Sequence, residues 1–252
     1  MIKQNTTHRG LLGIVEKIIR YIPIIYFFFR KLVKYTSYFE YDFYYLNKIF
    51  HNKKINIIDV GASDGIASKF FLNNLNVNKI FCIEPQSIFL SYLKRLKKKY
   101  PNVIKVFNYG LGNKSQTQSL YVPYVNFFGK KLYLSTYTFQ KKKELEKQII
   151  LDFLFYPKIT KIKIKLKKFL KVNVRIDLIK IDTNGSELNV ILTLINIIKK
   201  YRPVLIIENN DIENIYKLLK KYEYKKFYVL DGCIKKHNYQ NSGNVLFKIL
   251  KR

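Results

Sequence analysis

The sequence predicts an α/β fold, a doubly wound and mostly parallel sheet with helices on both faces. From Lys53 onward, short runs of β-branched residues alternate with longer amphipathic stretches, which is the pattern of successive β–α–β units. A glycine-containing turn directly follows the first run, at the position where such folds bind ligands. With 252 residues, 48% of them hydrophobic, the chain can bury a large core, which excludes intrinsic disorder.

Each element is predicted from its own local pattern. Strands are expected at 56–60, 79–83, 103–107, 118–122, 162–166, 177–181, 204–207, 227–230 and 245–250, where β-branched runs end at turn residues. Helices are expected at 66–75, 86–99, 141–155, 187–201 and 212–222, where apolar residues recur at helical spacing. The alternating lysines of 162–166 indicate one solvated strand face, and the last two strands suggest a closing antiparallel pair.

Residues 1–52 are expected to form an N-terminal helical extension, and residues 53–252 the main domain. An apolar stretch covers 11–29, but its uncharged part, Tyr21–Phe29, has nine residues and is too short to span a bilayer. It is expected either to pack on the main domain or to lie on a membrane surface. An aromatic helix should follow at 38–50. Without a secretory signal, the protein is expected to be cytoplasmic, and it could be peripheral to a membrane.

The charge of the chain is strongly positive. Lysine and arginine number 47 against 17 acidic residues, which gives a net charge of +30. Such a charge favours anionic partners, namely nucleic acid, an anionic membrane or an acidic polymer. The alternative is the coding bias of an AT-rich genome, because the chain is rich in Lys, Ile, Asn, Tyr and Phe and has no Trp. Two distant cysteines and three scattered histidines predict no metal site and a reducing compartment.

The most specific local signal is the turn after the first strand, Asp59-Val-Gly61-Ala62-Ser63-Asp64-Gly65. Glycine lets the backbone approach a ligand closely, and the next helix offers free N–H groups. The third glycine of a dinucleotide site is missing, which disfavours an NAD-dependent oxidoreductase. The two aspartates would repel a pyrophosphate but suit a ligand with an amino group and a sulfonium. The alternative is an ordinary strand-to-helix turn.

Two further strand ends are candidates for the same ligand site. Glu84, followed by Pro85, lies 23 residues after Gly61, where an acid in this type of fold accepts hydrogen bonds from both ribose hydroxyls of an adenosine. The alternative is a surface acid before a proline. The loop from Asn108 through Gly110 could lie along the adenine edge, or could be a plain turn.

The order and spacing of these motifs resemble one family. The matching segments are Asp59-Val-Gly-Ala-x-Asp-Gly65, Ile83-Glu84-Pro85, Asn108-x-Gly-Leu-Gly112, Ile176-Asp-Leu-Ile-Lys-Ile-Asp182-x-x-Gly185-x-Glu187 and Ile206-Ile-Glu208. This arrangement resembles the FkbM family of S-adenosylmethionine-dependent methyltransferases. The resemblance implies a class I methyltransferase fold, a Rossmann-like seven-stranded sheet whose last strand is antiparallel. It also implies S-adenosylmethionine as cofactor and methyl transfer to a hydroxyl, commonly of a sugar or a polyketide-type product.

The resemblance has two departures. Asn184 stands where the family usually has a glutamate, which puts an acid–base or substrate role of that position in doubt. Leu166-Lys167-Lys168 stands where the family often has Leu-Asp-Asp, a change that would loosen only a structural contact.

Methyl transfer to a hydroxyl requires alignment and the removal of one proton. Asp182 and Glu208 end adjacent predicted strands, so both are candidate catalytic residues, with Asp182 also expected at the cofactor. Asp182 is predicted to act as general base or to orient the acceptor, the alternative being a purely structural role. Glu187, at a helix start, is expected to cap or orient.

The expected acceptor is a glycan or small molecule. The +30 charge motivates an RNA methyltransferase as the alternative, but the Asp/Asn-Pro-Pro-Tyr motif of base methylation is absent, and Glu208 stands where ribose 2′-O enzymes have a lysine. Asn184 motivates a second alternative, a non-catalytic binding protein that retains the fold.

Overall fold

The structure is a computed structural model that describes residues 41–134, 137–152, 156–230, 233–235 and 243–250. The predicted apolar helix at 11–29 lies outside these residues. The described residues divide into two compact units, the first formed by those within 41–116 and 165–250 and the second by those within 117–164. In the part of the chain that the structure describes, no helix is long and apolar enough to cross a membrane.

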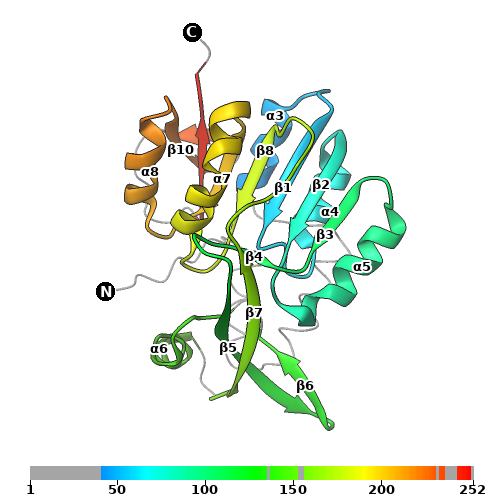
Figure 1. The fold of residues 1–252 in the computed structure, drawn as a ribbon, viewed down its shortest axis with the longest axis vertical. Helices are drawn as coiled ribbons and strands as arrows, with labels where there is room; N and C mark the ends of the chain where they lie inside the picture. The colour runs from blue at the N-terminus through cyan, green and yellow to red at the C-terminus, as the bar shows by residue number, and fades with distance from the viewer. Residues whose placement is uncertain (1–40, 135–136, 153–155, 231–232, 236–242, 251–252) are drawn as a thin grey trace. The chain divides into compact units, whose positions relative to one another are not determined.

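The first unit is built on an eight-stranded sheet in the order β11-β10-β12-β9-β8-β1-β2-β3 (Figure 1). Its strands are β1 (Ile55–Val60), β2 (Val77–Ile83), β3 (Ile104–Phe107), β8 (Leu178–Ile181), β9 (Val204–Glu208), β10 (Lys225–Leu230), β11 (Cys233–Lys235) and β12 (Asn244–Lys248). Strand β12 runs antiparallel to both β9 and β10, which confirms the predicted closing pair. The seven expected strands are present, and β11 is an addition at the edge. It was not predicted because three residues are too few to show a periodic pattern.

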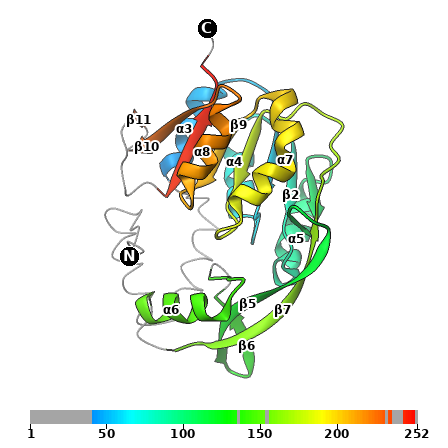
Figure 2. The ribbon, with the colours of Figure 1, turned by 60° about the vertical axis from the view of Figure 1, so that its left-hand side comes forward.

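Helices cover both faces of this sheet, as predicted (Figures 1 and 2). They are α3 (Tyr41–Ile49), α4 (Ile66–Asn74), a 3₁₀ turn (Ser87–Phe89) that leads into α5 (Leu90–Lys99), α7 (Glu187–Tyr201) and α8 (Ile212–Lys220). Helices α7 and α8 pack with Ile58 and Val60 of β1 in one buried cluster. Helices α3, α4 and α5 pack with Ile55 and Ile57 in another. The alternation of β1 side chains therefore divides the core into two layers.

Helix α3 is held by aromatic packing. The ring centroid of Phe43 lies 6.1 Å from that of Phe70 and 5.8 Å from that of Phe71, both on α4. Phe43 and Leu46 are fully buried. The predicted aromatic helix is therefore confirmed over Tyr41–Ile49, and it forms part of the core of the first unit. The domain boundary after residue 52 stays a prediction.

In the second unit, β5 (Gln116–Phe127) pairs antiparallel with β6 (Lys130–Tyr133). Strand β7 (Lys158–Lys167) and helix α6 (Lys142–Asp152) complete its described elements. The expected strand at 118–122 is thus longer than predicted. The exposed lysines of β7 alternate with less exposed residues, as its sequence indicates. The last three residues of β7, 165–167, belong to the first unit, where Leu166 and Lys167 pair with β4 (Gly110–Leu111).

Candidate functional site

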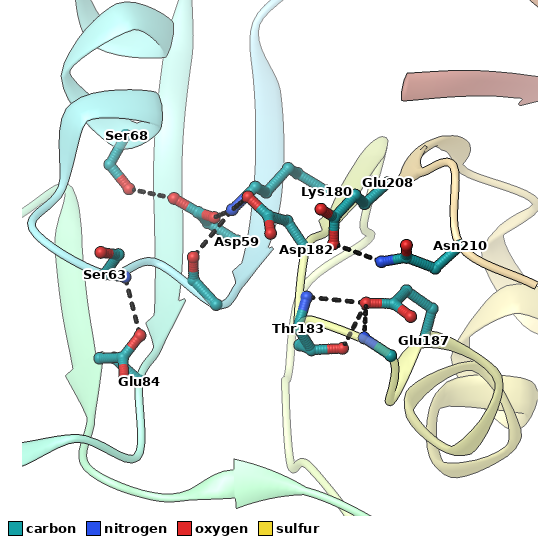
Figure 3. Close-up of polar contacts among 12 residues, drawn as sticks. Asp59, Ser63, Ser68, Glu84, Lys180, Asp182, Thr183, Glu187, Glu208 and Asn210 are labelled. Atoms are coloured by element: carbon teal, nitrogen blue, oxygen red, sulfur yellow. Dashed lines mark hydrogen bonds and ion pairs between the residues drawn. The ribbon is translucent and has the colours of Figure 1, made fainter. Parts of the chain in front are cut away.

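Four neighbouring strands place the predicted site residues along one edge of the sheet. In the order β2-β1-β8-β9, the strands end beside Glu84, the glycine turn, Asp182 and Glu208 (Figure 3). Ile181 of β8 is paired with Ile207 of β9, so Asp182 and Glu208 follow at matching positions. This edge corresponds to the crevice where open α/β sheets bind ligands.

The glycine turn fits tightly between its neighbours. Gly61 has φ +74°, and a Cβ atom there would lie 1.8 Å from the carbonyl oxygen of Asp182. The backbone N–H groups of Gly61 and Ala62 both donate to the carbonyl oxygen of Ile83, at 3.0 and 3.2 Å. Any side chain at position 61 would therefore push β1 and β8 apart. Gly65, with φ +79°, caps α4 at the other end of the turn.

Ser63 connects the glycine turn to the end of β2. Ser63 has a left-handed backbone, φ 49°, and its N–H donates to Glu84 Oε2 at 2.8 Å. Asp64 is buried. The turn and the end of β2 are thus joined through a carboxylate.

Glu84 is a buried carboxylate, with 2% of its surface exposed. It accepts a second hydrogen bond, in addition to that from Ser63, because the backbone N–H of Gln86 donates to Glu84 Oε1 at 2.8 Å. Burial nevertheless raises the pKa of Glu84 to about 7, because desolvation outweighs the two backbone hydrogen bonds. Each oxygen accepts one of these hydrogen bonds and retains a second lone pair that can accept a hydrogen bond from a hydroxyl group.

Asn108 and Gly110 have structural partners near Glu84. The Asn108 side-chain amide donates to the carbonyl oxygens of Glu84 and Pro85, at 3.1 and 3.2 Å. A Cβ atom at Gly110 would lie 2.7 Å from a methyl group of Leu166 and 3.5 Å from Pro85. Asn108 therefore fixes the position of the Glu84–Pro85 segment, whereas Gly110 leaves room for the side chain of Leu166.

A buried lysine, Lys180, lies at the centre of the site, although it is not among the residues predicted there. Lys180 Nζ donates to the carbonyl oxygen of Gly61 at 2.8 Å. It also lies 3.3 Å from Asp59 Oδ1 and 3.4 Å from Asp182 Oδ2. Its side chain is 4% exposed and that of Asp59 is fully buried. Asp59 Oδ2 accepts a hydrogen bond from the hydroxyl group of Ser68, whose Oγ is 2.6 Å away.

The two carboxylates keep Lys180 charged. Burial by itself lowers the pKa of Lys180, but attraction to Asp182 and Asp59 outweighs it, so the pKa is raised above its ordinary value. The signal for this role was present in the sequence, since Lys180 interrupts the apolar strand Leu178–Ile181 two residues before Asp182. Side chains two residues apart lie on one face of a strand.

The turn after β8 is organised by Glu187. Its Oε1 accepts hydrogen bonds from the Thr183 N–H and hydroxyl, at 2.9 and 3.0 Å, and from the Gly185 N–H at 3.1 Å. This matches the orienting role expected from its position. Asn184, with φ 52°, adopts a left-handed backbone that asparagine tolerates better than glutamate, so the departure at this position has a local structural reason.

Asp182 and Glu208 are more accessible than Asp59 and Glu84. The side chain of Asp182 is 43% exposed. Glu208 is partly buried, and its Oε2 accepts a hydrogen bond from the Asn210 side-chain amide at 2.7 Å. Among the described residues, no three His, Cys, Asp or Glu side chains form a group that could hold a metal ion. The carboxylates along this edge can accept hydrogen bonds and protons.

A family model described as "Methyltransferase FkbM domain" matches residues 59–226, which is more than half of the chain. The chain belongs to the FkbM methyltransferase family. Its cofactor is S-adenosylmethionine, and its fold is the class I methyltransferase fold that the sequence predicts. A search of curated proteins found no match to this chain.

Solved structures with similar folds include an FkbM methyltransferase from Methylobacillus flagellatus KT, with a TM-score of 0.51 and 15% sequence identity. The similarity covers 77% of this chain but only 43% of that one, so this FkbM chain spans less than half of that protein. An rRNA methylase from Streptococcus thermophilus has a TM-score of 0.42 and 9% identity, with 82% and 93% of the two chains covered. M. capricolum TrmK in complex with S-adenosyl-homocysteine has a TM-score of 0.38 and 13% identity, with 81% and 66% covered.

Proposed function

We propose that this FkbM-family protein methylates a hydroxyl group of a sugar or glycan. The observation that supports this acceptor class most is Asp182, a half-exposed carboxylate that ends β8 directly beside the glycine turn. A hydroxyl acceptor must lose a proton as it is methylated, and a carboxylate at this position can accept it. Glu208, on the adjacent strand, is the second candidate for this role.

The residues at this edge fit S-adenosylmethionine, whose bound form supplies an electrophilic methyl group. Six of the 17 acidic residues lie along it in a chain of charge +30, namely Asp59, Asp64, Glu84, Asp182, Glu187 and Glu208. Such a concentration suits a ligand with an ammonium and a sulfonium. We propose that Gly61–Gly65 hold its amino acid part and that Glu84 accepts the ribose hydroxyls. Pro85, Asn108 and Gly110 would line the adenosine side.

The acidic edge also bears on the choice between glycan and RNA. RNA phosphates would be repelled by the half-exposed carboxylate of Asp182 and the partly buried one of Glu208, whereas a neutral sugar hydroxyl would not. The basic residues elsewhere on the chain still favour RNA as an alternative acceptor. Asn184 supports a second alternative, in which the protein binds the cofactor without transferring the methyl group.

Labelled methyl transfer would distinguish these functions. The full chain is incubated with methyl-labelled cofactor and either extracted glycans or total RNA, and we expect the label in the glycan fraction. Label found only in RNA would contradict the proposal. Cofactor binding in calorimetry, with no transfer to either fraction or to small hydroxyl metabolites, would support a non-catalytic protein instead.

Replacing Glu84 with Gln is expected to weaken cofactor binding by about 1–3 kcal/mol, because the charge-assisted bonds to the ribose are lost. The wild-type affinity should fall as the pH drops below about 7, where Glu84 takes up a proton. For each pH unit below this pKa, the wild-type affinity should fall by up to about tenfold, until it reaches the affinity of Glu84→Gln. Calorimetric titrations at several pH values between roughly 5.5 and 8.5, on both sides of this pKa, would measure both effects.

The folding stability should depend on pH in the opposite direction to the cofactor affinity. Since the folded-state pKa of Glu84 is raised from 4.5 to about 7, its favourable contribution is present below pH 4.5 and is lost as the pH rises through 7. The cofactor-free wild type should therefore lose about 3 kcal/mol relative to Glu84→Gln over this range. Glu223→Gln, at an exposed surface pair with Arg202, is the matched control. Parallel pH profiles of the wild type and Glu84→Gln would refute the prediction.

A further inference from the structure

The turn between β5 and β6 has an unexpected residue. Phe127 of β5 pairs with Lys130 of β6, so Phe128 and Gly129 form a two-residue hairpin turn (Figure 1). Both have positive φ angles, 43° and 74°, as in a type I′ turn. The first position of such a turn favours Asn, Asp or Gly, and a bulky side chain is disfavoured there. The stability of the hairpin therefore does not explain Phe128.

Packing does not explain it either. Phe128 is 91% exposed, the highest value of any large hydrophobic side chain among the described residues. Its ring contacts the ring of Phe127, which is itself 36% exposed, edge to face at a centroid distance of 4.5 Å. Two adjacent aromatic rings thus lie in water at the end of the hairpin. A residue that violates a local rule without a gain in packing is expected at a functional site.

The charged residues near these rings in the sequence are all positive. Residues 85–143 contain no Asp or Glu, and Lys130 and Lys131 directly follow the turn. Lys131 Nζ lies 4.8 Å from the centroid of the Tyr124 ring, on the opposite strand. Over residues 117–164, which lie in the second unit, nine lysines stand against three acidic residues. The tip, Asn126–Lys131, therefore combines exposed apolar rings with adjacent cations.

We propose that this tip anchors the protein to a bilayer that contains anionic lipid, with Phe127 and Phe128 inserted at the level of the headgroups. Aromatic rings next to lysines suit this interface, since the rings enter the apolar boundary while the ammonium groups pair with lipid phosphates. An apical turn residue can enter a bilayer without disturbing the strands behind it. The anchor lies on the surface of the membrane and does not span it.

A nucleic acid fits this tip less well. Residues 117–164 contain no arginine, which is the residue that usually provides bidentate phosphate contacts. The two rings also contact each other edge to face, at 74°, so they do not form a flat stacking platform for successive bases. The anchor is independent of the proposed methyl transfer, because the glycine turn and Asp182 lie in the first unit.

Because the chain has no tryptophan, a single Phe128→Trp substitution gives a fluorescent probe at the tip. On vesicles of phosphatidylcholine with phosphatidylserine, its emission should shift to the blue and should be quenched by brominated lipid. Phe169→Trp, at a 54% exposed phenylalanine that also lies beside lysines, is the control and should show neither change. An unshifted, unquenched probe at position 128 on bound protein would overturn the proposal.

Vesicle sedimentation tests the energetics of the same tip. Phe128→Asn should lower binding to anionic vesicles by roughly tenfold, and Lys130→Gln and Lys131→Gln by about fivefold each. Phe169→Asn should leave binding unchanged. Since Asn suits the turn, Phe128→Asn should be at least as stable as the wild type and should still bind the cofactor. If this variant instead loses binding to single-stranded RNA while its vesicle binding is unchanged, the tip is a nucleic-acid contact and the membrane proposal fails.

Discussion

Replacing Asp182 with Asn is expected to lower the turnover number by about 10²–10⁴-fold, which is the range for loss of a general base. The amide cannot accept the proton of the acceptor hydroxyl, but it keeps the shape of the side chain. Because Asp182 is 43% exposed, the fold should tolerate the change. Cofactor affinity should change far less than turnover, since Gly61–Gly65 and Glu84 are untouched. Steady-state kinetics with the acceptor that takes the label, together with calorimetry of the cofactor, measure the two quantities.

Two other variants test whether the loss of turnover is specific to Asp182. Glu208→Gln, at the second candidate, should reduce turnover less than Asp182→Asn if Asp182 accepts the proton. Asp211→Asn replaces an exposed acid at the start of α8 and should leave turnover unchanged. If Asp182→Asn retains wild-type turnover across the pH range, Asp182 has only a structural role. If Glu208→Gln shows the larger loss, the assignment of the two carboxylates must be exchanged.

Replacing Lys180 with Met should destabilise the folded protein by about 3–5 kcal/mol, as expected when one partner of a buried ion pair is removed. The methionine fills a similar volume, so the loss arises from charge and not from a cavity. Asp59 would remain fully buried without its counter-ion, and the carbonyl oxygen of Gly61 would lose its hydrogen bond from Lys180. Urea denaturation of the cofactor-free protein, monitored by far-ultraviolet circular dichroism, measures the difference.

A double variant separates the ion pair from other effects of the substitution. Lys180→Met combined with Asp59→Asn removes both buried charges and should recover a large part of the lost stability. Lys226→Met offers a contrasting lysine, because its partner Glu213 is 63% exposed and can be solvated without it. That substitution should cost less than about 1 kcal/mol. A similarly small effect at Lys180 would show that Asp59 does not depend on the ammonium group.

Much of this protein could be predicted from local sequence patterns. The runs of β-branched residues gave the strands of the main sheet, because a buried parallel strand requires such a run wherever it lies in the chain. The turn Gly61–Gly65 and the acids Glu84 and Asp182 could be placed at one edge, because parallel strands end on the same side. Helix Glu187–Tyr201 was predicted with the bounds that it has in the structure, since fifteen residues show a clear helical period.

The tertiary structure decided what depends on residues far apart in the chain. Lys180 and Gly61 are 119 residues apart, and only the pairing of β1 with β8 brings the ammonium group to that carbonyl oxygen and to Asp59. The same applies to Gly61, where a side chain is excluded by the backbone carbonyl oxygen of Asp182, directly after β8. The exposure of Phe128 likewise follows from its place in a two-residue turn, which the sequence around it does not indicate. Strand periodicity is local, whereas register and burial are set by the packing of the whole fold.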